Sequence, residues 1–197
     1  MPSITCYPTR GFYIEKYTHK KPMPDMHYHR TYELYYTVEG ERDYFVGDRY
    51  FKVRKNDLVF IPAGMLHRTA GKGATRFLLY FSRRFAERFF TEETLYSILP
   101  DEPFVFRPKE HDKRLHDAFA SLLYDFSEQE RDPEKKNEVC LAGGLFRLLY
   151  HVRMEENHYA VQDHTEERIS LIIKFINDNF ATIANLDQVA ERFFISK

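Results

Sequence analysis

The stretch HYHRTYELYYTVEGERDYFV, residues 27–46, decides the fold. It is rich in aromatic and β-branched residues, which favour strands, and its segment Glu39-Gly40-Glu41 is typical of a turn. We therefore expect strands at Tyr32–Val38 and Asp43–Val46. Regular alternation of such runs with turn residues is typical of an antiparallel sandwich or barrel. The same pattern of aromatic and β-branched runs separated by turn residues predicts further short strands at Gly11–Tyr17, Tyr50–Val53, Leu58–Ile61 and Arg76–Phe81.

The composition is that of a folded domain. The 197 residues are 43% hydrophobic and include 18 Phe and 14 Tyr, which is enough to form a sizeable core and excludes a disordered chain. There are 29 basic and 30 acidic residues, so the formal net charge is only -1. The surface as a whole therefore has no electrostatic footprint for wrapping nucleic acid.

The sequence also excludes a membrane protein, because no apolar run approaches the ~20 residues that span a bilayer. Met1–Arg10 has no basic segment followed by an apolar one, so we expect no secretory signal and a cytoplasmic location. Cys6 and Cys140 form no Cys-x-x-Cys pair, and we interpret both as ordinary thiols.

The later part of the chain changes from a strand period to a helix period. Apolar residues recur at three- and four-residue steps in Asp112–Glu130 and in Glu134–Glu156, so we expect two helices. Arg131-Asp132-Pro133 is the expected turn between them, because proline suits a first helical turn. The resulting antiparallel hairpin either caps the barrel or pairs two subunits, and the sequence leaves both open. The pair Gly143-Gly144 lowers helix propensity by about 1 kcal/mol per glycine, and we expect it where another backbone packs close.

A linker at Asn157–His164 precedes two more expected helices. Thr165 is the expected N-cap of the first, and Asn185 is the expected N-cap of the second, which runs to about Phe194.

Four residues carry the chemistry: His27, His29, Glu33 and His67. On an extended strand the first two imidazoles point to the same face, because they are separated by one residue. Three imidazole nitrogens and one carboxylate oxygen that converge inside a barrel form a site for Zn, Ni, Fe or Mn. The alternative is a polar pocket that binds a ligand without a metal.

The same residues carry a family resemblance. The string His27-x-His29-x3-Glu33-x6-Gly40 resembles the first cupin motif, and Pro62-x-Gly64-x2-His67 resembles the second. This chain has Asn56 where the second motif usually has Gly, and Gly71 where it usually has Asn. The resemblance implies a cupin jelly-roll barrel in which the three histidines and the glutamate occupy the metal-ligand positions.

Further residues are candidates for the lining of a ligand pocket. Alternation along the strand from Glu33 turns two of them toward the side of the carboxylate. Aromatic faces with a few polar tips suit sugars or small aromatic acids, although plain barrel packing explains each residue as well. The candidates are Arg10, Tyr35, Thr37, Tyr44, Phe60 and Tyr80.

The segment Ile169–Ser196 resembles the start of the DNA-binding region of AraC-type transcription regulators. The matching features are Phe175-Ile176-x-x-Asn179-Phe180 and Leu186-x-x-Val189-Ala190-x-x-Phe193-x-Ile195-Ser196. A helix-turn-helix reads bases with its second helix, which would lie beyond Lys197. The resemblance therefore implies the regulatory part of a longer regulator, and no residue of this chain is assigned to DNA contact.

Together these features predict a mostly β cupin barrel at 1–110, a helical hairpin at 111–157, and a linker with the start of a helix-turn-helix at 158–197, in an α+β chain. We expect the effector-sensing and dimerisation region of an AraC-type regulator, with no catalytic residue. The expected effector is a sugar or another small molecule. The expected partners are a second copy of the chain and, for the full-length protein only, DNA. Leu145, Leu149 and Val152 are the candidates for a self-complementary dimer interface.

Two other functions remain open at this stage. A cupin metalloenzyme, such as a dioxygenase or a sugar isomerase or epimerase, would use the metal held by the four residues to polarise a substrate. A metal sensor would respond to the ion itself.

Overall fold

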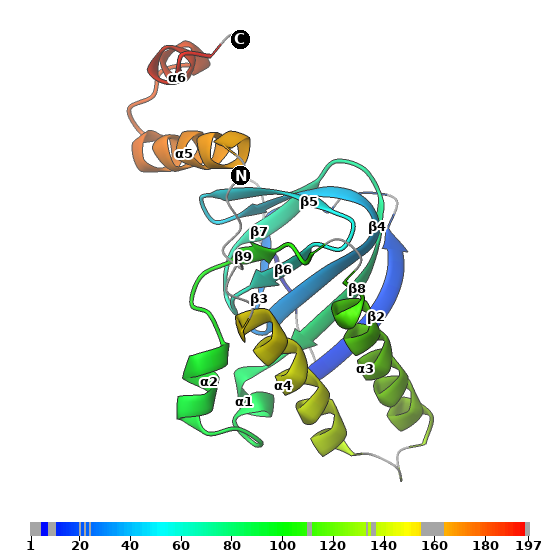
Figure 1. Ribbon diagram of the computed structural model, residues 1–197. Helices are drawn as coiled ribbons and strands as arrows, with labels where there is room; N and C mark the ends of the chain where they lie inside the picture. The colour runs from blue at the N-terminus through cyan, green and yellow to red at the C-terminus, as the bar shows by residue number, and fades with distance from the viewer. Residues whose placement is uncertain are drawn as a thin grey trace.

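The computed structural model describes residues 5–7, 11–19, 21, 23, 25–109, 112–132, 134, 137–154 and 164–195. Two curved layers of strands form a barrel, with helices packed on one side and further helices beyond its other end (Figure 1). The strands are β1 (Thr5–Tyr7), β2 (Phe12–His19), β3 (His27–His29), β4 (Tyr32–Val46), β5 (Arg49–Arg54), β6 (Leu58–Ile61), β7 (His67–Ala70), β8 (Ala74–Phe81) and β9 (Phe104–Phe106). The helices are α1 (Arg83–Ala86), α2 (Glu92–Ile98), α3 (Arg114–Arg131), α4 (Glu138–Met154), α5 (His164–Asn179) and α6 (Leu186–Phe193).

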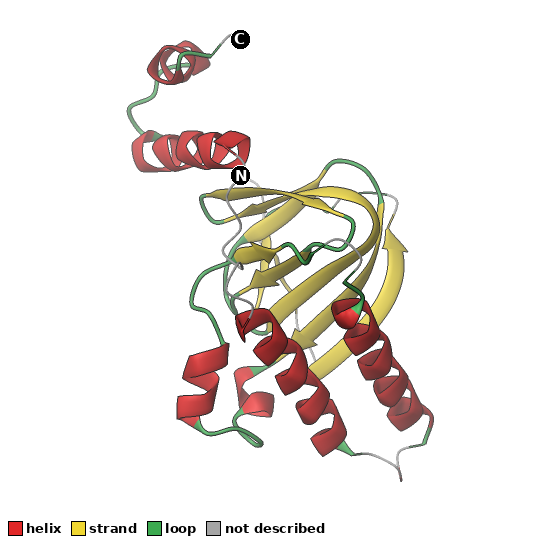
Figure 2. Ribbon diagram, viewed as in Figure 1, coloured by secondary structure: helices red, strands yellow, loops and turns green. Residues whose placement is uncertain are grey.

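Strand β4 belongs to both layers. Its first part pairs with β6 and β8, and its second part pairs with β5 and β7, always antiparallel. Strand β2 extends the first layer through β8, and β3 extends the second through β7. Figure 2 shows the strands as one continuous yellow body with the helices outside it, which confirms the predicted mostly β barrel followed by helices.

The predicted turn at Glu39-Gly40-Glu41 is wrong, because β4 continues through it. The register with β8 shifts between Thr37 and Glu39, and Gly40 has φ 89°. A Cβ at Gly40 would lie 2.5 Å from the carbonyl oxygen of Gly73, so only glycine fits. The glycine therefore bends the strand from one layer into the other instead of ending it, as bulges do at the corners of barrels.

The turn after β5 explains one departure from the cupin motif. Asn56 adopts φ 70°, a left-handed conformation in which glycine is the easiest residue and asparagine is among the best tolerated alternatives. Oδ2 of Asp57 accepts the backbone N–H of Arg54 at 2.8 Å and closes the turn. Asparagine thus serves the backbone role that glycine has in the motif.

Alternation along β4 separates two apolar clusters. Leu34 and Tyr36 face an outer cluster that includes buried residues of all four helices α1–α4. Tyr35 faces an inner cluster between the two layers, which also contains Tyr44 and Phe51. The phenyl ring of Phe119, on α3, stacks on Tyr36 with ring centroids 5.4 Å apart. The helices therefore cover the barrel, and the interior of the barrel remains a separate compartment.

The hairpin caps its own barrel, and the predicted dimer residues are part of that cap. Leu145, Leu149 and Val152 are 0%, 4% and 5% exposed and belong to the outer cluster. Their assignment to an interface between subunits is therefore wrong, because their side chains are already buried within one chain. The helical period located the apolar face correctly but does not say whether the same chain covers it.

The predicted second cap is confirmed. Oδ1 of Asn185 accepts the backbone N–H groups of Asp187 and Gln188 at the start of α6. Helix α5 begins at His164, and the side chain of the predicted cap Thr165 lies outside the described residues, as does most of the predicted linker. Helix α5 lies against β5, where the backbone N–H of Tyr50 donates to Oγ of Ser170 at 2.9 Å.

Within the described ranges, no helix is both long enough and apolar enough to cross a bilayer.

The adjacent glycines of α4 allow a matched test of the hairpin packing. A Cβ at Gly144 would lie 2.5 Å from Cδ2 of Leu122 on α3, whereas a Cβ at Gly143 meets nothing within 4 Å. We expect Gly143→Ala to raise the free energy of unfolding by about 0.5–1 kcal/mol, because alanine favours the helix. Gly144→Ala should lower it by about 1–2 kcal/mol through overpacking. Urea unfolding of both variants checks this, and equal effects at the two positions would contradict the close approach.

Candidate functional site

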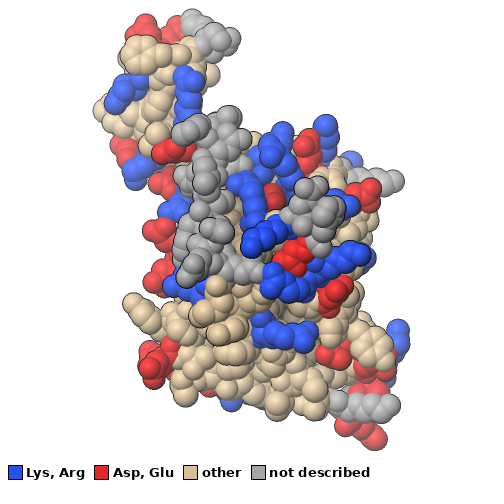
Figure 3. Space-filling view, in the orientation of Figure 1, with Lys and Arg blue, Asp and Glu red and all other residues tan. Residues whose placement is uncertain are grey.

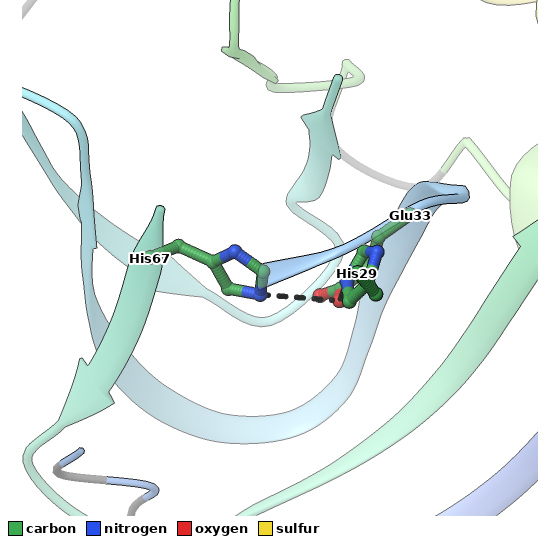
Figure 4. A group of neighbouring side chains, drawn as sticks. All are labelled: His29, Glu33 and His67. Carbon is green, nitrogen blue, oxygen red and sulfur yellow. Dashed lines mark hydrogen bonds and ion pairs between the residues drawn. The ribbon is translucent and has the colours of Figure 1, made fainter. Parts of the chain in front are cut away.

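His29, Glu33 and His67 meet inside the barrel from three different strands (Figure 4). Nε2 of His29 lies 3.0 Å from Oε2 of Glu33, and Nε2 of His67 lies 3.6 Å from the same oxygen. One possible ligand atom from each residue lies within 4.8 Å of the other two. All three side chains are buried. We call this group the triad.

Backbone carbonyls determine which imidazole nitrogen faces the triad. Nδ1 of His29 lies 2.7 Å from the carbonyl oxygen of Thr31, and Nδ1 of His67 lies 2.9 Å from that of Met65. A carbonyl oxygen only accepts, so each Nδ1 carries a proton and donates it. Nε2 of each ring is thereby turned toward Glu33, which is how histidine ligands are oriented in metal sites.

The triad requires a positive charge among its members. Burial acts to raise the pKa of Glu33, but the imidazoles of His29 and His67 hold that pKa well below its ordinary value. Desolvation acts to lower the pKa of His67, but the Glu33 carboxylate outweighs it and the pKa is raised. An ionised carboxylate repels the Nε2 lone pair of a neutral imidazole. Either a second proton on an imidazole of the triad or a cation between its members must therefore offset the negative charge of Glu33.

The donor set of the triad fits a divalent cation of the Zn, Ni, Fe or Mn class. Nε2 of His67 is buried and has no hydrogen-bond partner within the part of the chain that the structure describes. Such a nitrogen in a protein interior normally has a partner, and a cation would supply one. Two imidazoles and one carboxylate also leave coordination positions open for water or a ligand.

His27 lies beside the triad and is not one of its members. Its ring centroid is 4.2 Å from that of His67, and its Nδ1 lies 3.1 Å from the carbonyl oxygen of Asp25. Burial, assisted by the neighbouring His67, lowers the pKa of His27. Of the four predicted ligands, the structure thus brings three together and places the fourth in ring contact with one of them.

Four predicted pocket residues line the same barrel interior as the triad. The hydroxyl of Tyr44 donates to Oε1 of Glu33 at 3.2 Å, and the ring of Tyr35 lies 5.0 Å from that of Tyr44. The ring of Tyr80 meets that of His29 edge to face at 4.8 Å. Thr37 is fully buried on the same face of β4 as Glu33 and Tyr35. Phenol and hydroxyl groups therefore line the barrel interior beside and beyond the triad.

Two predicted pocket residues lie elsewhere. Phe60 belongs to the outer cluster, where its ring stacks with those of Tyr32 and Phe104, so its assignment to the pocket is wrong. It pairs with Leu34 across β4 and β6 and therefore shares the outward face of that residue. Arg10 lies outside the described residues.

Sequence reasoning missed two interior arginines. Arg42 is 3% exposed and Arg76 is 8% exposed. Arg42 alternates with Tyr44 and Val46 along β4, which places it on the inner face. Arg76 pairs with Thr37 across β4 and β8. Charged residues rarely lie inside a fold, so only the strand register could have indicated these two.

The opposite pKa shifts of the two neighbouring histidines can be measured. In metal-free protein we expect His67 to titrate above the ordinary histidine pKa of 6.5 and His27 to titrate below it. Glu33→Gln should lower the pKa of His67, because desolvation then acts without the opposing carboxylate. NMR titration of the imidazole Cε1–H signals measures both values. The described charge balance would be wrong if His67 titrated below His27 in the unsubstituted protein.

Comparison with known proteins adds three structural likenesses. ToxT from Vibrio cholerae O395 is 10% identical, over 95% of this chain and 71% of that one, with TM-score 0.44. Wild-type ToxT with bound unsaturated fatty acid, from Vibrio cholerae strain SCE256, is 10% identical, over 94% and 69%, with TM-score 0.46. Oxalate decarboxylase from Bacillus subtilis is 22% identical, over 46% and 26%, with TM-score 0.33. A search of curated proteins found no match.

Comparison with models of protein families shows the family to which the chain belongs. Residues 11–139 match the AraC-like ligand binding domain, and this range runs from β2 to the start of α4. It contains the triad, the tyrosines beside it and both buried arginines. The chain therefore belongs to the family of AraC-like ligand binding domains.

Proposed function

We propose that the chain is the effector-sensing region of an AraC-type transcription regulator and has no catalytic turnover. The observation that carries the proposal is the family match over 11–139, a range that encloses the buried polar interior of the barrel. The effector is a small molecule that binds in that interior. In this proposal the regulator acts in the cytoplasm as a homodimer.

The helices after the barrel support a regulator. Helix α6 has a defined start after its N-cap Asn185 and ends at Phe193, and the C-cap Phe194 has φ 52°. Among its apolar residues Val189 is buried, whereas Leu186 and Phe194 are 76% and 91% exposed. A helix with this exposed apolar surface needs a partner, and we assign that partner to the rest of a helix-turn-helix unit that contacts DNA.

Contact between α5 and β5 supplies a route from the effector to these helices. Phe51 is part of the inner cluster, and the preceding residue, Tyr50, donates its backbone N–H to Ser170. An effector that repacks Phe51 also displaces the strand edge against which α5 lies. Such a route works only as far as the effector binds the two arrangements with different affinity.

We further propose that the triad holds a divalent metal ion, with His27 close by. The ion would supply a positive centre and open coordination positions for oxygen atoms of the effector. The residues of the chain would orient it, since Nδ1 of both triad histidines is held by a backbone carbonyl. This ligand set also favours a second candidate function, a cupin metalloenzyme, and the two functions differ in whether the bound molecule is converted.

Metal binding is tested by titrating chelator-treated protein with Zn, Ni, Mn and Fe(II) salts in a calorimeter. His67→Ala and Glu33→Gln should weaken binding by at least about 100-fold, because each removes a ligand of the triad. His27→Gln should have a smaller effect, because its donor lies outside the group. Binding should also release protons, seen as a dependence of the heat on the buffer.

The control variant is His116→Gln, on α3 and outside the barrel interior. The triad would not be the metal site if His67→Ala bound as tightly as the parent chain.

Sensing and catalysis are separated by a thermal-shift screen of sugars and small carboxylates. A sensor should be stabilised by one class of compound, by about 2.7 kcal/mol at 100 times the dissociation constant. NMR of the stabilising compound after hours with metal-loaded protein should show it unchanged. Conversion at about 1 per second or faster would support the metalloenzyme and contradict the sensor.

A further inference from the structure

The barrel interior contains the guanidinium groups of Arg42 and Arg76, and the proposed metal site gives neither of them a role. By strand register, Thr37 and Arg76 face each other four residues along from the pair formed by Glu33 and Tyr80. This separation corresponds to ~13 Å along the strands. The pair of Thr37 and Arg76, which we call the arginine level, therefore lies in the same compartment as the triad but further along the strands. A buried arginine is rare unless an acidic or accepting group compensates its charge.

For Arg76, the described residues supply only part of this compensation. Nη2 of Arg76 lies 3.8 Å from Oε1 of Glu15, a residue whose side chain is about one third exposed. Nη1 of Arg42 donates to the carbonyl oxygen of Lys21 at 3.1 Å. Arg76 also lies over the rings of Tyr17 and Tyr35, at 5.6 and 5.5 Å from their centroids. These contacts hold the guanidinium groups in place, but Nη1 of Arg76 has no hydrogen-bond partner among the described residues.

Three neighbouring polar atoms are buried without a hydrogen-bond partner in the ranges that the structure describes. They are Nη1 of Arg76, Oη of Tyr35 and Oγ1 of Thr37. Tyr35 and Thr37 are 3% and 0% exposed, and both lie on the inner face of β4, beside the inner face of the neighbouring strand β8. Buried polar atoms are nearly always paired, so three orphaned ones around the Arg76 guanidinium indicate a ligand that pairs with them.

We propose that this level is the recognition site for the carboxylate group of the effector, with Arg76 as its main partner and Thr37, Tyr35 and Arg42 around it. The inference rests on the proposed sensing function and names the chemical class of its ligand. A carboxylate accepts two parallel hydrogen bonds from one guanidinium and keeps further acceptor capacity for hydroxyl groups.

The surroundings favour an organic acid over a sugar. A neutral sugar would leave only the partly exposed carboxylate of Glu15, 3.8 Å away, to compensate the charge of Arg76 among the described residues. Burial raises the pKa of Tyr35, against the effect of Arg42 and Arg76, so its hydroxyl stays protonated and able to donate. Leu78, paired with Tyr35 on β8, and Val53 of the inner cluster provide apolar contact for the rest of the molecule. Since Glu33 repels a second anion, the carboxylate lies at the arginine level and the remaining body extends toward the triad.

The test uses matched acids and amides. Benzoate, phenylacetate and hexanoate are each compared with their primary amides, next to a set of neutral sugars, by thermal shift and calorimetry at pH 7. We expect binding of at least one acid and at least about tenfold weaker binding of its amide, the loss typical of one charge-assisted hydrogen bond. Arg76→Gln should weaken binding of the acid by about 10- to 100-fold. The control Arg54→Gln, at an exposed position of β5, should leave it unchanged.

Thr37→Val keeps the inference testable if Arg76→Gln fails to fold. The substitution keeps the shape of the side chain and removes a hydroxyl without a partner, so the ligand-free variant should melt at the same or a higher temperature than the parent. Its affinity for the acid should fall several-fold. This combination of retained stability and reduced affinity is not expected of a hydroxyl that serves only the fold.

Two results would overturn the inference: none of the acids binds, or amides and sugars bind as tightly as the acids. In either case a neutral compound that binds without being converted leaves the sensing function in place. Conversion of the bound acid would instead contradict the sensing function while supporting the carboxylate site.

Discussion

The arrangement depends on the continuity of β4 across the bend at Gly40. Because one strand serves both layers, its alternation assigns every side chain to one of two compartments: Leu34 and Tyr36 to the helices, and Glu33, Tyr35 and Thr37 to the barrel interior. A slip by one residue would bury the polar set under the helices and turn the apolar set inward. Stacking of Tyr36 on Phe119 opposes such a slip, so the packing of the helices also fixes the position of the site.

The sequence predicted most of the long elements, since their periods are strong. It also identified the triad, because His29, Glu33 and His67 lie in recognisable motifs. Errors arose where a residue's role depends on its partner. Gly40 bends a strand because β8 stays paired beyond it, Phe60 faces outward because it pairs with Leu34, and Leu149 is covered by its own chain. Short elements such as α1 and β9 were missed, since so few residues carry little periodic signal.

Unpaired polar groups inside the barrel lower the stability of the fold. Leaving a buried donor or acceptor unpaired typically costs about 1–3 kcal/mol, which is a sizeable fraction of the roughly 5–15 kcal/mol that hold a domain folded. The two outward-facing residues of β4 belong to the larger apolar cluster under α1–α4, where burial supplies the main stabilisation. Separating the two compartments allows one to be optimised for folding while the other retains Oγ1 of Thr37 and Nη1 of Arg76, buried atoms with no hydrogen-bond partner in the part of the chain that the structure describes.

This separation also bears on how a ligand in the proposed site would be sensed. The helical cap contacts the outer cluster, so a change inside the barrel reaches it only through the backbone of the strands. Strand β5 is different, because Phe51 lies in the inner cluster while its neighbour Tyr50 donates its backbone N–H to Oγ of Ser170 on α5. Such a bond contributes about 0.5–1.5 kcal/mol, and the exposed pair of Lys174 with Asp48 adds at most about 1 kcal/mol. In the proposed mechanism, a ligand that prefers one packing of Phe51 would therefore act on α5 through the neighbouring residue of the same strand.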